Sequence, residues 1–362
     1  MIGLYVHIPF CKRKCPYCDF FSVCADAQDH VRYAETLCRH IRIASEKYPQ
    51  KADTLYFGGG TPSLIGETLI SDILHTAKDN FGLDDAEITL EVNPEKRDID
   101  FDKLRKSGVN RISVGLQSAN DDELQQLGRL HNVSDAKHCI SAAKSAGFDN
   151  ISLDLMLATP LQTKDSLKRS VDFCAEQGAS HISAYLLKIE PDTPFDSRPD
   201  KDLLCDDDRQ AEFYLYASEL IASCGYEQYE ISNFAKQGFE GKHNLKYWHD
   251  EEYLGFGAAA HSFIGGRRFY CGRSFEEFYA RSFTDDGLGG SEEEFLMLGL
   301  RLSEGITHQR YRQRFQKDIP DHILQNAKRL IPSGLLTVTD SGIALTKQGF
   351  LLSNAVIAKL LS

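Results

Sequence analysis

The stretch Cys11-Lys12-Arg13-Lys14-Cys15-Pro16-Tyr17-Cys18-Asp19-Phe20 places three thiols within eight residues, directly after the apolar run Ile2–Val6. Thiolates select zinc, copper(I) or iron–sulfur clusters. Closed structural zinc sites use four protein ligands, whereas this C-x3-C-x2-C spacing supplies three and no obvious fourth. The spacing therefore predicts a metal site, held by Cys11, Cys15 and Cys18, with one coordination position left open.

Two other interpretations of the three thiols stay open from the residues alone. A zinc knuckle would be completed by His7, Asp19 or Cys24, and three unliganded surface thiols would bind no metal. Free cysteines seldom gather at such spacing in a surface loop, so the metal site is the favoured interpretation. The basic run Lys12–Lys14 is assigned no role beyond a solvated face.

The composition is that of a globular protein. With 362 residues, 42% of them hydrophobic and 26% charged, the chain has room for one large core and an appended domain. The net charge of −12 disfavours a broad phosphate-binding surface, so no nucleic acid is expected. No apolar segment approaches the roughly 20 residues that span a bilayer, and no leader precedes the first strand. We expect a cytoplasmic protein.

Cysteine usage agrees with a reducing compartment. Seven of the ten cysteines lie outside the motif, at scattered positions such as Cys38, Cys139, Cys174 and Cys224. These positions fall within helix-like segments, which is typical of reduced, mostly buried thiols and not of a disulfide framework.

Short β-type runs alternate with helical patterns through the first half of the chain. The six runs are Ile2–His7, Thr54–Phe57, Ile88–Val92, Arg111–Gly115, Ile151–Met156 and Ile182–Leu187. Alternation of this kind predicts an α/β fold with a parallel sheet, and six units predict an incomplete (β/α)6 barrel of the TIM type. In such barrels the chemistry lies at the carboxyl ends of the strands.

Polar or glycine residues follow the ends of several predicted strands. Three consecutive glycines, Gly58–Gly60, remove every Cβ from a strand-to-helix turn and allow backbone to approach a ligand closely. Glu91 and Gln117 end the third and fourth runs, and Asp154 lies inside an apolar strand, where an acid is costly unless it is paired. A tight turn would explain the glycines, and partners from crossover helices would explain the acids. Arg129 by itself is typical of a surface arginine.

The cysteine spacing and the aromatic residue after it resemble the signature of the radical S-adenosylmethionine (SAM) superfamily. Tyr5, the cysteines, the glycine triplet, Glu91, the SVGLQS element, Arg129, Asp154 and the strand Ser183-Ala184-Tyr185 follow the order of its coproporphyrinogen dehydrogenase-like branch. The resemblance covers about half of the chain. It implies a [4Fe-4S] cluster whose fourth iron takes SAM, and a SAM site that includes Tyr5, Phe20, Gly58, Gly59, Gly60, Thr61, Glu91, Gln117, Arg129, Asp154, Met156 and Ala184.

The resemblance also implies a role for each group of these residues. The glycine triplet receives the amino end of SAM, and Glu91 and Arg129 hold its amino-acid end. Gln117 and Asp154 bind the ribose, and the adenine is bordered by Phe20, Met156 and Ala184. The chemistry is reasonable on independent grounds, because a planar, permanently charged arginine suits a carboxylate, and oxygen acceptors suit hydroxyls and an ammonium.

The second half of the chain carries one further motif. After a connection at Lys188–Asp202 and a helix at Asp206–Ser223, the stretch Lys242–Trp248 contains the only tryptophan. A lone histidine beside aromatic residues is usually structural. However, His243-Asn244-Leu245-Lys246-Tyr247-Trp248 resembles the HNxxYW motif of the haem-binding chaperones of this branch, the HemW-type proteins, which implies that His243 ligates haem. His261 is the alternative ligand.

The chain divides into three expected parts: the barrel at 1–200, a connecting segment at 201–288 that holds the HNxxYW motif, and a C-terminal domain at 289–362. Helix-forming stretches at Glu292–Leu302 and His308–Phe315, followed by two short strands, predict a winged-helix-like module. Such modules often bind DNA, but the acidic balance and the lack of a basic recognition helix favour a packing or protein-contact role.

The resemblance favours a haem chaperone that takes haem from donors and passes it to haem-requiring proteins, for example respiratory enzymes, with transient contact to a membrane surface through them. One alternative is an oxygen-independent coproporphyrinogen III oxidase. That pattern adds a cysteine two residues after the third and a long segment before the cluster, whereas Phe20 stands at that position here. A second alternative is a non-catalytic barrel with structural zinc. The residues leave open whether SAM is cleaved in function; oxidase activity is not expected.

Overall fold

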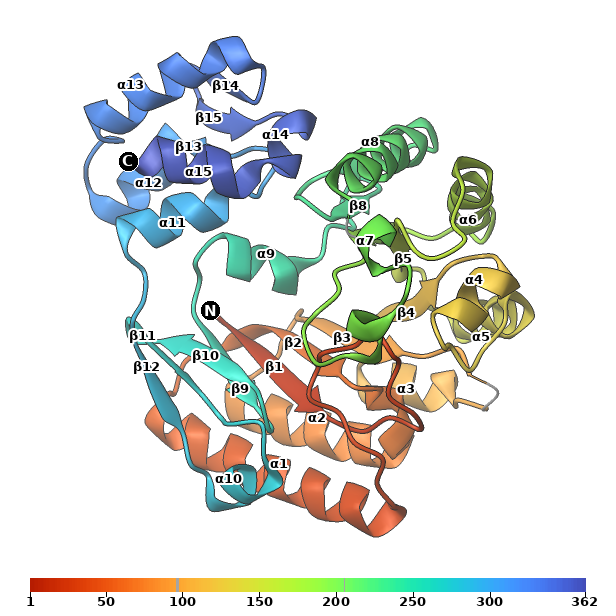
Figure 1. The fold of residues 1–362 in the computed structure, drawn as a ribbon. Helices are drawn as coiled ribbons and strands as arrows, with labels where there is room; N and C mark the ends of the chain where they lie inside the picture. The colour runs from red at the N-terminus through yellow and green to blue at the C-terminus, as the bar shows by residue number, and fades with distance from the viewer. Residues whose placement is uncertain (96–97, 205) are drawn as a thin grey trace.

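The computed structural model describes residues 1–95, 98–204 and 206–362, and its main feature is one large curled sheet (Figure 1). The six predicted strands form and pair in parallel in chain order: β1 (Ile2–Ile8), β2 (Ala52–Gly59), β3 (Glu87–Val92), β4 (Arg111–Gln117), β5 (Ile151–Leu157) and β6 (His181–Leu186). Helices connect them: α1 (Ala27–Lys47), α2 (Glu67–Phe81), α3 (Phe101–Ser107), α4 (Asp121–Gln126), α5 (Val133–Ser145) and α6 (Lys164–Glu176). The predicted α/β fold is confirmed.

Alternation of side chains along the strands explains both faces of this sheet. In β5, Leu153 and Leu155 are buried against the helices, whereas Ser152, Asp154 and Met156 line the concave side. Successive strand residues point to opposite faces, so an apolar residue at every second position suffices to bury the helix-facing side. The concave side is therefore free to carry polar residues.

The segment 201–288 adds strands at both edges of the sheet. After α8 (Asp207–Ser223), β7 (Glu227–Gln228) and β8 (Asn233–Ala235) extend the β6 edge antiparallel. At the other edge β9 (Tyr253–Phe256) pairs in parallel with β1, followed by β10 (His261–Ile264), β11 (Arg267–Tyr270) and β12 (Thr284–Leu288). The segment also carries α9 (Lys242–Trp248) and α10 (Phe275–Ala280).

The C-terminal module packs beside this extension (Figure 1). Its helices are α11 (Glu292–Gly299), α12 (His308–Phe315), α13 (Asp321–Leu330), α14 (Lys347–Leu351) and α15 (Ser353–Leu361). Its three strands, β13 (Ile306–Thr307), β15 (Gly342–Leu345) and β14 (Leu336–Thr339), pair antiparallel in that order. Helices followed by a short antiparallel hairpin give the predicted winged-helix-like arrangement.

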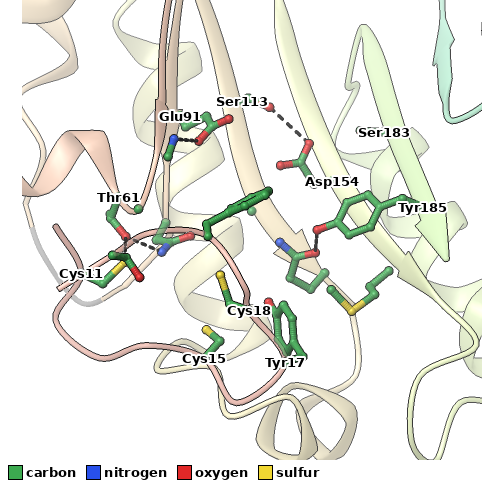
Figure 2. A pocket seen from close by; sticks show the side chains of 18 of the residues that line it. Cys11, Cys15, Tyr17, Cys18, Thr61, Glu91, Ser113, Asp154, Ser183 and Tyr185 are labelled. Atoms are coloured by element: carbon green, nitrogen blue, oxygen red, sulfur yellow. Dashed lines mark hydrogen bonds between the residues drawn. The ribbon is translucent and has the colours of Figure 1, made fainter. Parts of the chain in front are cut away.

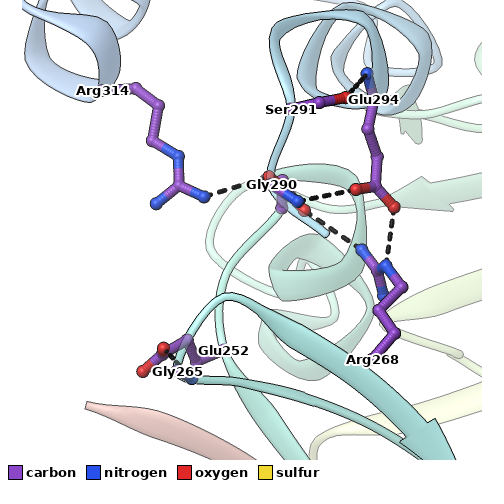
Figure 3. Close-up of polar contacts among 8 residues, drawn as sticks. Glu252, Gly265, Arg268, Gly290, Ser291, Glu294 and Arg314 are labelled. Atoms are coloured by element: carbon purple, nitrogen blue, oxygen red, sulfur yellow. Dashed lines mark hydrogen bonds and ion pairs between the residues drawn. The ribbon is translucent and has the colours of Figure 1, made fainter. Parts of the chain in front are cut away.

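Charged contacts fix the module to the extended sheet (Figure 3). Arg268 of β11 donates to Glu294 of α11 at 2.7 Å, and Glu294 accepts the Gly290 N–H at 2.7 Å. Asp250, whose side chain is 0% exposed, pairs with both Arg268 and Arg314 at 3.2 Å. A buried carboxylate requires such partners, because an unpaired buried charge is strongly destabilising. The junction is thus specified by charge as well as by apolar packing.

Two properties of the described part of the chain bear on its surroundings. None of the helices in the three described ranges combines the length and the apolar character that crossing a membrane requires. The cysteines in these ranges are all free thiols, and Cys38, Cys139, Cys174 and Cys271 are buried.

Candidate SAM and iron–sulfur site

A cavity of about 550 Å³ opens at the carboxyl ends of the parallel strands (Figure 2). The loop after β1 contributes the three motif cysteines to its wall, and β2 to β6 contribute the polar residues of the concave face. The predicted residues that line it are Cys11, Cys15, Cys18, Phe20, Gly59, Gly60, Thr61, Glu91, Gln117, Arg129, Asp154 and Met156. Residues separated by up to 145 positions in sequence, from Cys11 to Met156, therefore meet in one space.

The three cysteines are half-buried and face this cavity (Figure 2). The Cys11 Sγ lies 3.6 Å from Thr61 Oγ1, and the Cys15 Sγ accepts from an Arg129 Nη at 3.6 Å. Burial raises the pKa of the Cys11 and Cys18 thiols above the ordinary value. Buried thiols of this kind gain from a cationic metal group, which binds the thiolate form.

The proposed fourth ligands of a zinc knuckle are engaged elsewhere. Both His7 nitrogens are within hydrogen-bond distance of protein atoms, Tyr5 Oη and the Phe21 carbonyl, each at 3.0 Å. Asp19 pairs with Arg273 at 3.1 Å, and the Cys24 thiol donates to the Lys12 carbonyl at 3.2 Å. In the part of the chain that the structure describes, no three His, Cys, Asp or Glu side chains converge on one ion. Spread thiols suit a [4Fe-4S] cluster, in which three of the irons would each take one thiolate.

Glu91 is the central carboxylate of the cavity. Its Oε1 accepts from the Tyr56 hydroxyl at 2.8 Å and its Oε2 accepts from the Gly59 N–H at 3.2 Å. Burial raises the pKa of Glu91 to about 7, against the lowering effect of the Tyr56 hydrogen bond. A carboxyl poised near neutral pH is ready to ionise when a cationic ligand approaches.

Arg129 lines the same cavity beside the cysteine loop. One Nη donates to Asn93 Oδ1 at 2.6 Å and to the Gly115 carbonyl at 2.9 Å, and Nε has no partner among the described residues. A buried guanidinium with an unused donor can take a carboxylate. Gly115 makes room for the arginine, because a Cβ there would lie 3.1 Å from its Nη2 and 2.9 Å from Asn93 Oδ1.

The far wall carries the predicted ribose contacts. Asp154 accepts from the Ser113 hydroxyl at 3.2 Å, and burial raises its pKa to about 6. Gln117, held at a φ of +68°, accepts from the Tyr185 hydroxyl at 2.7 Å. A left-handed conformation is costly for a residue with a side chain, and such strain is concentrated at functional sites. Here it turns the amide into the cavity.

Three predicted residues, Tyr5, Gly58 and Ala184, do not line the cavity. Tyr5 lies beneath the glycine turn, where its ring would contact a Cβ at Gly58 at 3.0 Å. Ala184 is 1% exposed and belongs to the core between sheet and helices. Its neighbours Ser183 and Tyr185 line the cavity instead, as the strand alternation requires.

The glycine turn is dictated largely by the protein's own packing. Gly59 has a φ of +115°, and a Cβ there would lie 2.6 Å from the His7 ring. A Cβ at Gly60 would lie 2.8 Å from the Phe10 carbonyl and 3.0 Å from Cys11 Sγ. The glycines therefore let the turn pack against β1 and the cysteine loop, in addition to leaving backbone N–H groups near the cavity.

Several cavity residues were absent from the sequence-based prediction. Arg111 is 2% exposed, and its Nε has no hydrogen-bond partner among the described residues. Its positive charge acts to lower the pKa of both Glu91 and Asp154. Tyr56 and Asn93 orient Glu91 and Arg129. The sequence signal that could have identified these residues is the alternation of side chains with a period of two, followed along the whole length of each strand instead of only at its end.

His243 lies away from the cavity mouth, in the packing between α9 and the first two strands. Its ring is 1% exposed, with Nδ1 2.8 Å from Thr54 Oγ1 and Nε2 2.7 Å from Tyr247 Oη. It stacks on Tyr56 at 5.3 Å, and burial lowers its pKa to about 3. Both ring nitrogens are thus occupied, so iron ligation would require one of these contacts to break. His261 is exposed and stacks on Tyr270 at 4.9 Å.

Comparisons with known proteins agree with this geometry. Residues 5–174 match the family model of the radical SAM superfamily, and residues 293–352 match that of the HemN C-terminal domain. The solved structure of coproporphyrinogen III oxidase (HemN) from Escherichia coli, a radical SAM enzyme, has a TM-score of 0.84 over 99% of this chain and 89% of its own, at 22% identity. That likeness establishes the fold alone. Fold and site define a radical SAM protein.

The sequence relatives narrow this class. The heme chaperone HemW of Bacillus subtilis (strain 168) is 35% identical over an alignment of 381 positions, which covers 100% of this chain and 99% of the relative. The heme chaperone HemW of Escherichia coli (strain K12) is 37% identical over 264 residues, 72% of this chain and 69% of the relative. The chain belongs to the HemW family of heme chaperones.

Proposed function

We propose that this protein is a haem chaperone that binds haem and passes it to haem-requiring proteins, with a [4Fe-4S] cluster and SAM bound in the barrel. The observation that carries the cofactor part is the convergence of three half-buried thiols, Glu91 and Arg129 on one cavity. The haem part rests on the family, whose members are named heme chaperones. The free thiols among the described residues suit the reducing compartment that we expect, the cytoplasm.

Different residues of the cavity would bind different parts of SAM. Glu91 would accept the ammonium and Arg129 the carboxylate of the amino-acid end, because both line the cavity and their charges are complementary to those two groups. Gln117 and Asp154 would accept the ribose hydroxyls. Phe20, which is 66% exposed at the mouth, would cover the adenine and exclude water.

Cys11, Cys15 and Cys18 would bind the cluster, and the fourth iron would be available to SAM. When bound, such a cluster supplies one-electron reduction of the sulfonium. The chain's own contribution is orientation: Thr61 and Arg129 hold the thiol loop, and Tyr56 holds Glu91.

Coproporphyrinogen oxidation is the alternative, because the HemN structure shares this fold. A sequence feature weighs against it: Phe20 stands two residues after Cys18, where the oxidase pattern has a further cysteine. The chaperone relatives, in contrast, match at 35% identity along the whole chain.

The test is anaerobic reconstitution of the full chain with iron and sulfide, followed by titration with haem and an assay with coproporphyrinogen, SAM and reductant. We expect about four irons per chain, a Soret band on haem addition and no protoporphyrinogen. Turnover of coproporphyrinogen without haem affinity would establish the oxidase instead. Stoichiometric colourless zinc would establish the structural barrel.

A further inference from the structure

A second cavity, of about 430 Å³, lies on the convex side of the sheet extension, between β9–β11 and the helices α1 and α10. Its volume falls within the roughly 300–1,000 Å³ typical of small-molecule sites. It shares no lining residue with the SAM cavity. The radical SAM chemistry therefore does not account for it.

Strand alternation gives this cavity an aromatic and aliphatic wall. Phe256 of β9 and Ile264 of β10 point to its side of the sheet, and Phe269 of β11 lies beside them. Phe278 and Phe283 close it from the α10 side, and Phe283 is 44% exposed at the rim. His261 belongs to the alternate set of β10 residues and lies on the opposite face of the sheet.

One helix face contributes the polar groups. His40, Ala44 and Lys47 lie on α1 at the spacing of neighbouring turns and line the cavity together. His40 is 5% exposed, packs edge-on against Phe278 at 5.0 Å, and its Nε2 has no hydrogen-bond partner among the described residues. A buried imidazole nitrogen without a partner is costly, which is the mark of an unused ligand position.

Cations surround the opening. Lys47, Arg267 and Arg281 line it, and Arg267 is paired with Asp285 at 2.6 Å. The Nε of Arg281 has no hydrogen-bond partner in the described ranges. A flat apolar ligand with carboxylates at one edge and a metal at its centre would be complementary to the aromatic wall, the imidazole and the cationic side chains together. Haem has these features.

We propose that this cavity is the haem-binding site, with His40 as the axial ligand and Lys47 and Arg281 facing the propionates. The proposal rests on the proposed haem-chaperone function and locates its cargo outside the barrel, on the far side of the sheet from SAM. It differs from ligation by His243, whose ring nitrogens already have partners, and from ligation by the exposed His261.

The test is titration of the reconstituted full chain with haemin, comparing wild type with His40→Ala, His243→Ala and His261→Ala. Loss of even an outer-shell partner costs metal sites roughly 10-fold in affinity, so loss of the axial ligand should weaken haem binding by at least about tenfold. The Soret band of His40→Ala should shift, and added imidazole should restore it. Rescue by imidazole distinguishes a lost ligand from general misfolding.

A rim variant keeps the proposal testable if His40→Ala folds poorly. Lys47→Glu changes only an exposed side chain and should weaken haem binding roughly fivefold, whereas Lys78→Glu on α2 is the matched control and should not. Unchanged haem binding in both His40→Ala and Lys47→Glu would overturn the site and leave the chaperone function standing. Absence of haem binding in wild type would overturn both.

Discussion

Glu91 should make SAM binding depend on pH. The carboxyl must be ionised to receive an ammonium, and its pKa in the ligand-free protein is about 7. With that pKa the ionised fraction rises from about 10% at pH 6 to about 90% at pH 8, so the Kd for SAM should fall about tenfold over this range. Glu91→Gln should bind SAM more weakly and without this pH dependence.

The same group predicts the opposite trend for stability. The unfolded carboxyl, with its ordinary pKa of 4.5, is ionised throughout the range, whereas the native one is protonated at pH 6. The native state therefore binds more protons, and raising the pH favours unfolding. Integration from pH 6 to 8 gives a loss of about 1.4 kcal/mol in the free energy of unfolding that Glu91→Gln should not show.

The assays are calorimetric titration of the reconstituted protein with SAM at pH 6, 7 and 8, and urea unfolding of the reduced apoprotein at the same pH values. Asp154→Asn is the comparison variant: with a pKa of about 6, Asp154 is already half ionised at pH 6, so its ionised fraction changes only about twofold over this range, against about tenfold for Glu91. A tenfold pH effect on SAM affinity that persists in Glu91→Gln would refute the assignment of the ammonium to this carboxylate.

Three further outcomes are expected. Alanine at any one of the three motif cysteines should abolish cluster assembly in iron and sulfide assays. Cys24→Ala, which removes a thiol that donates to the Lys12 carbonyl, should retain the cluster, and equal loss in all four variants would refute the assignment. Arg129→Lys should weaken SAM binding by at least about tenfold, because an ammonium cannot replace the planar fork, and unchanged affinity would move the carboxylate elsewhere. Asp250→Asn should lower the free energy of unfolding by about 3 kcal/mol, because two arginines lose a buried partner. Asp285→Asn, which removes an exposed ion pair with Arg267, should lower it by less than about 1 kcal/mol. Equal losses would show that the junction does not depend on charge.

The fold of the first half was predictable because each strand carries its own signal. The run Ile151–Met156 shows an apolar residue at every second position, and helical spacing follows it, so strand, orientation and crossover all come from local pattern. The cavity residues at the strand ends followed from this pattern and the barrel rule. The roles of Glu91 and Arg129 came instead from the family resemblance.

The edge strands were not predictable in the same way. The strand Tyr253–Phe256 pairs in parallel with β1 across more than 240 residues of chain, and no local pattern in four residues specifies such a partner. The second cavity depends on this pairing, because α1 and β9–β11 meet only in the folded sheet. His40 carried no signal in the sequence for that reason.

The placement of His243 affects how any loss of haem binding in its variants should be interpreted. Its ring supports Tyr56 by stacking, and the Tyr56 hydroxyl in turn holds Glu91 at 2.8 Å. Removing the imidazole would leave Thr54 and Tyr247 without their buried partner and open a void beneath Tyr56. Haem binding could then weaken through disturbed packing even if His243 is not the iron ligand. Affinity alone therefore cannot assign the ligand, whereas a Soret shift that imidazole reverses can, because only a variant that has lost the axial nitrogen leaves an open position on the iron.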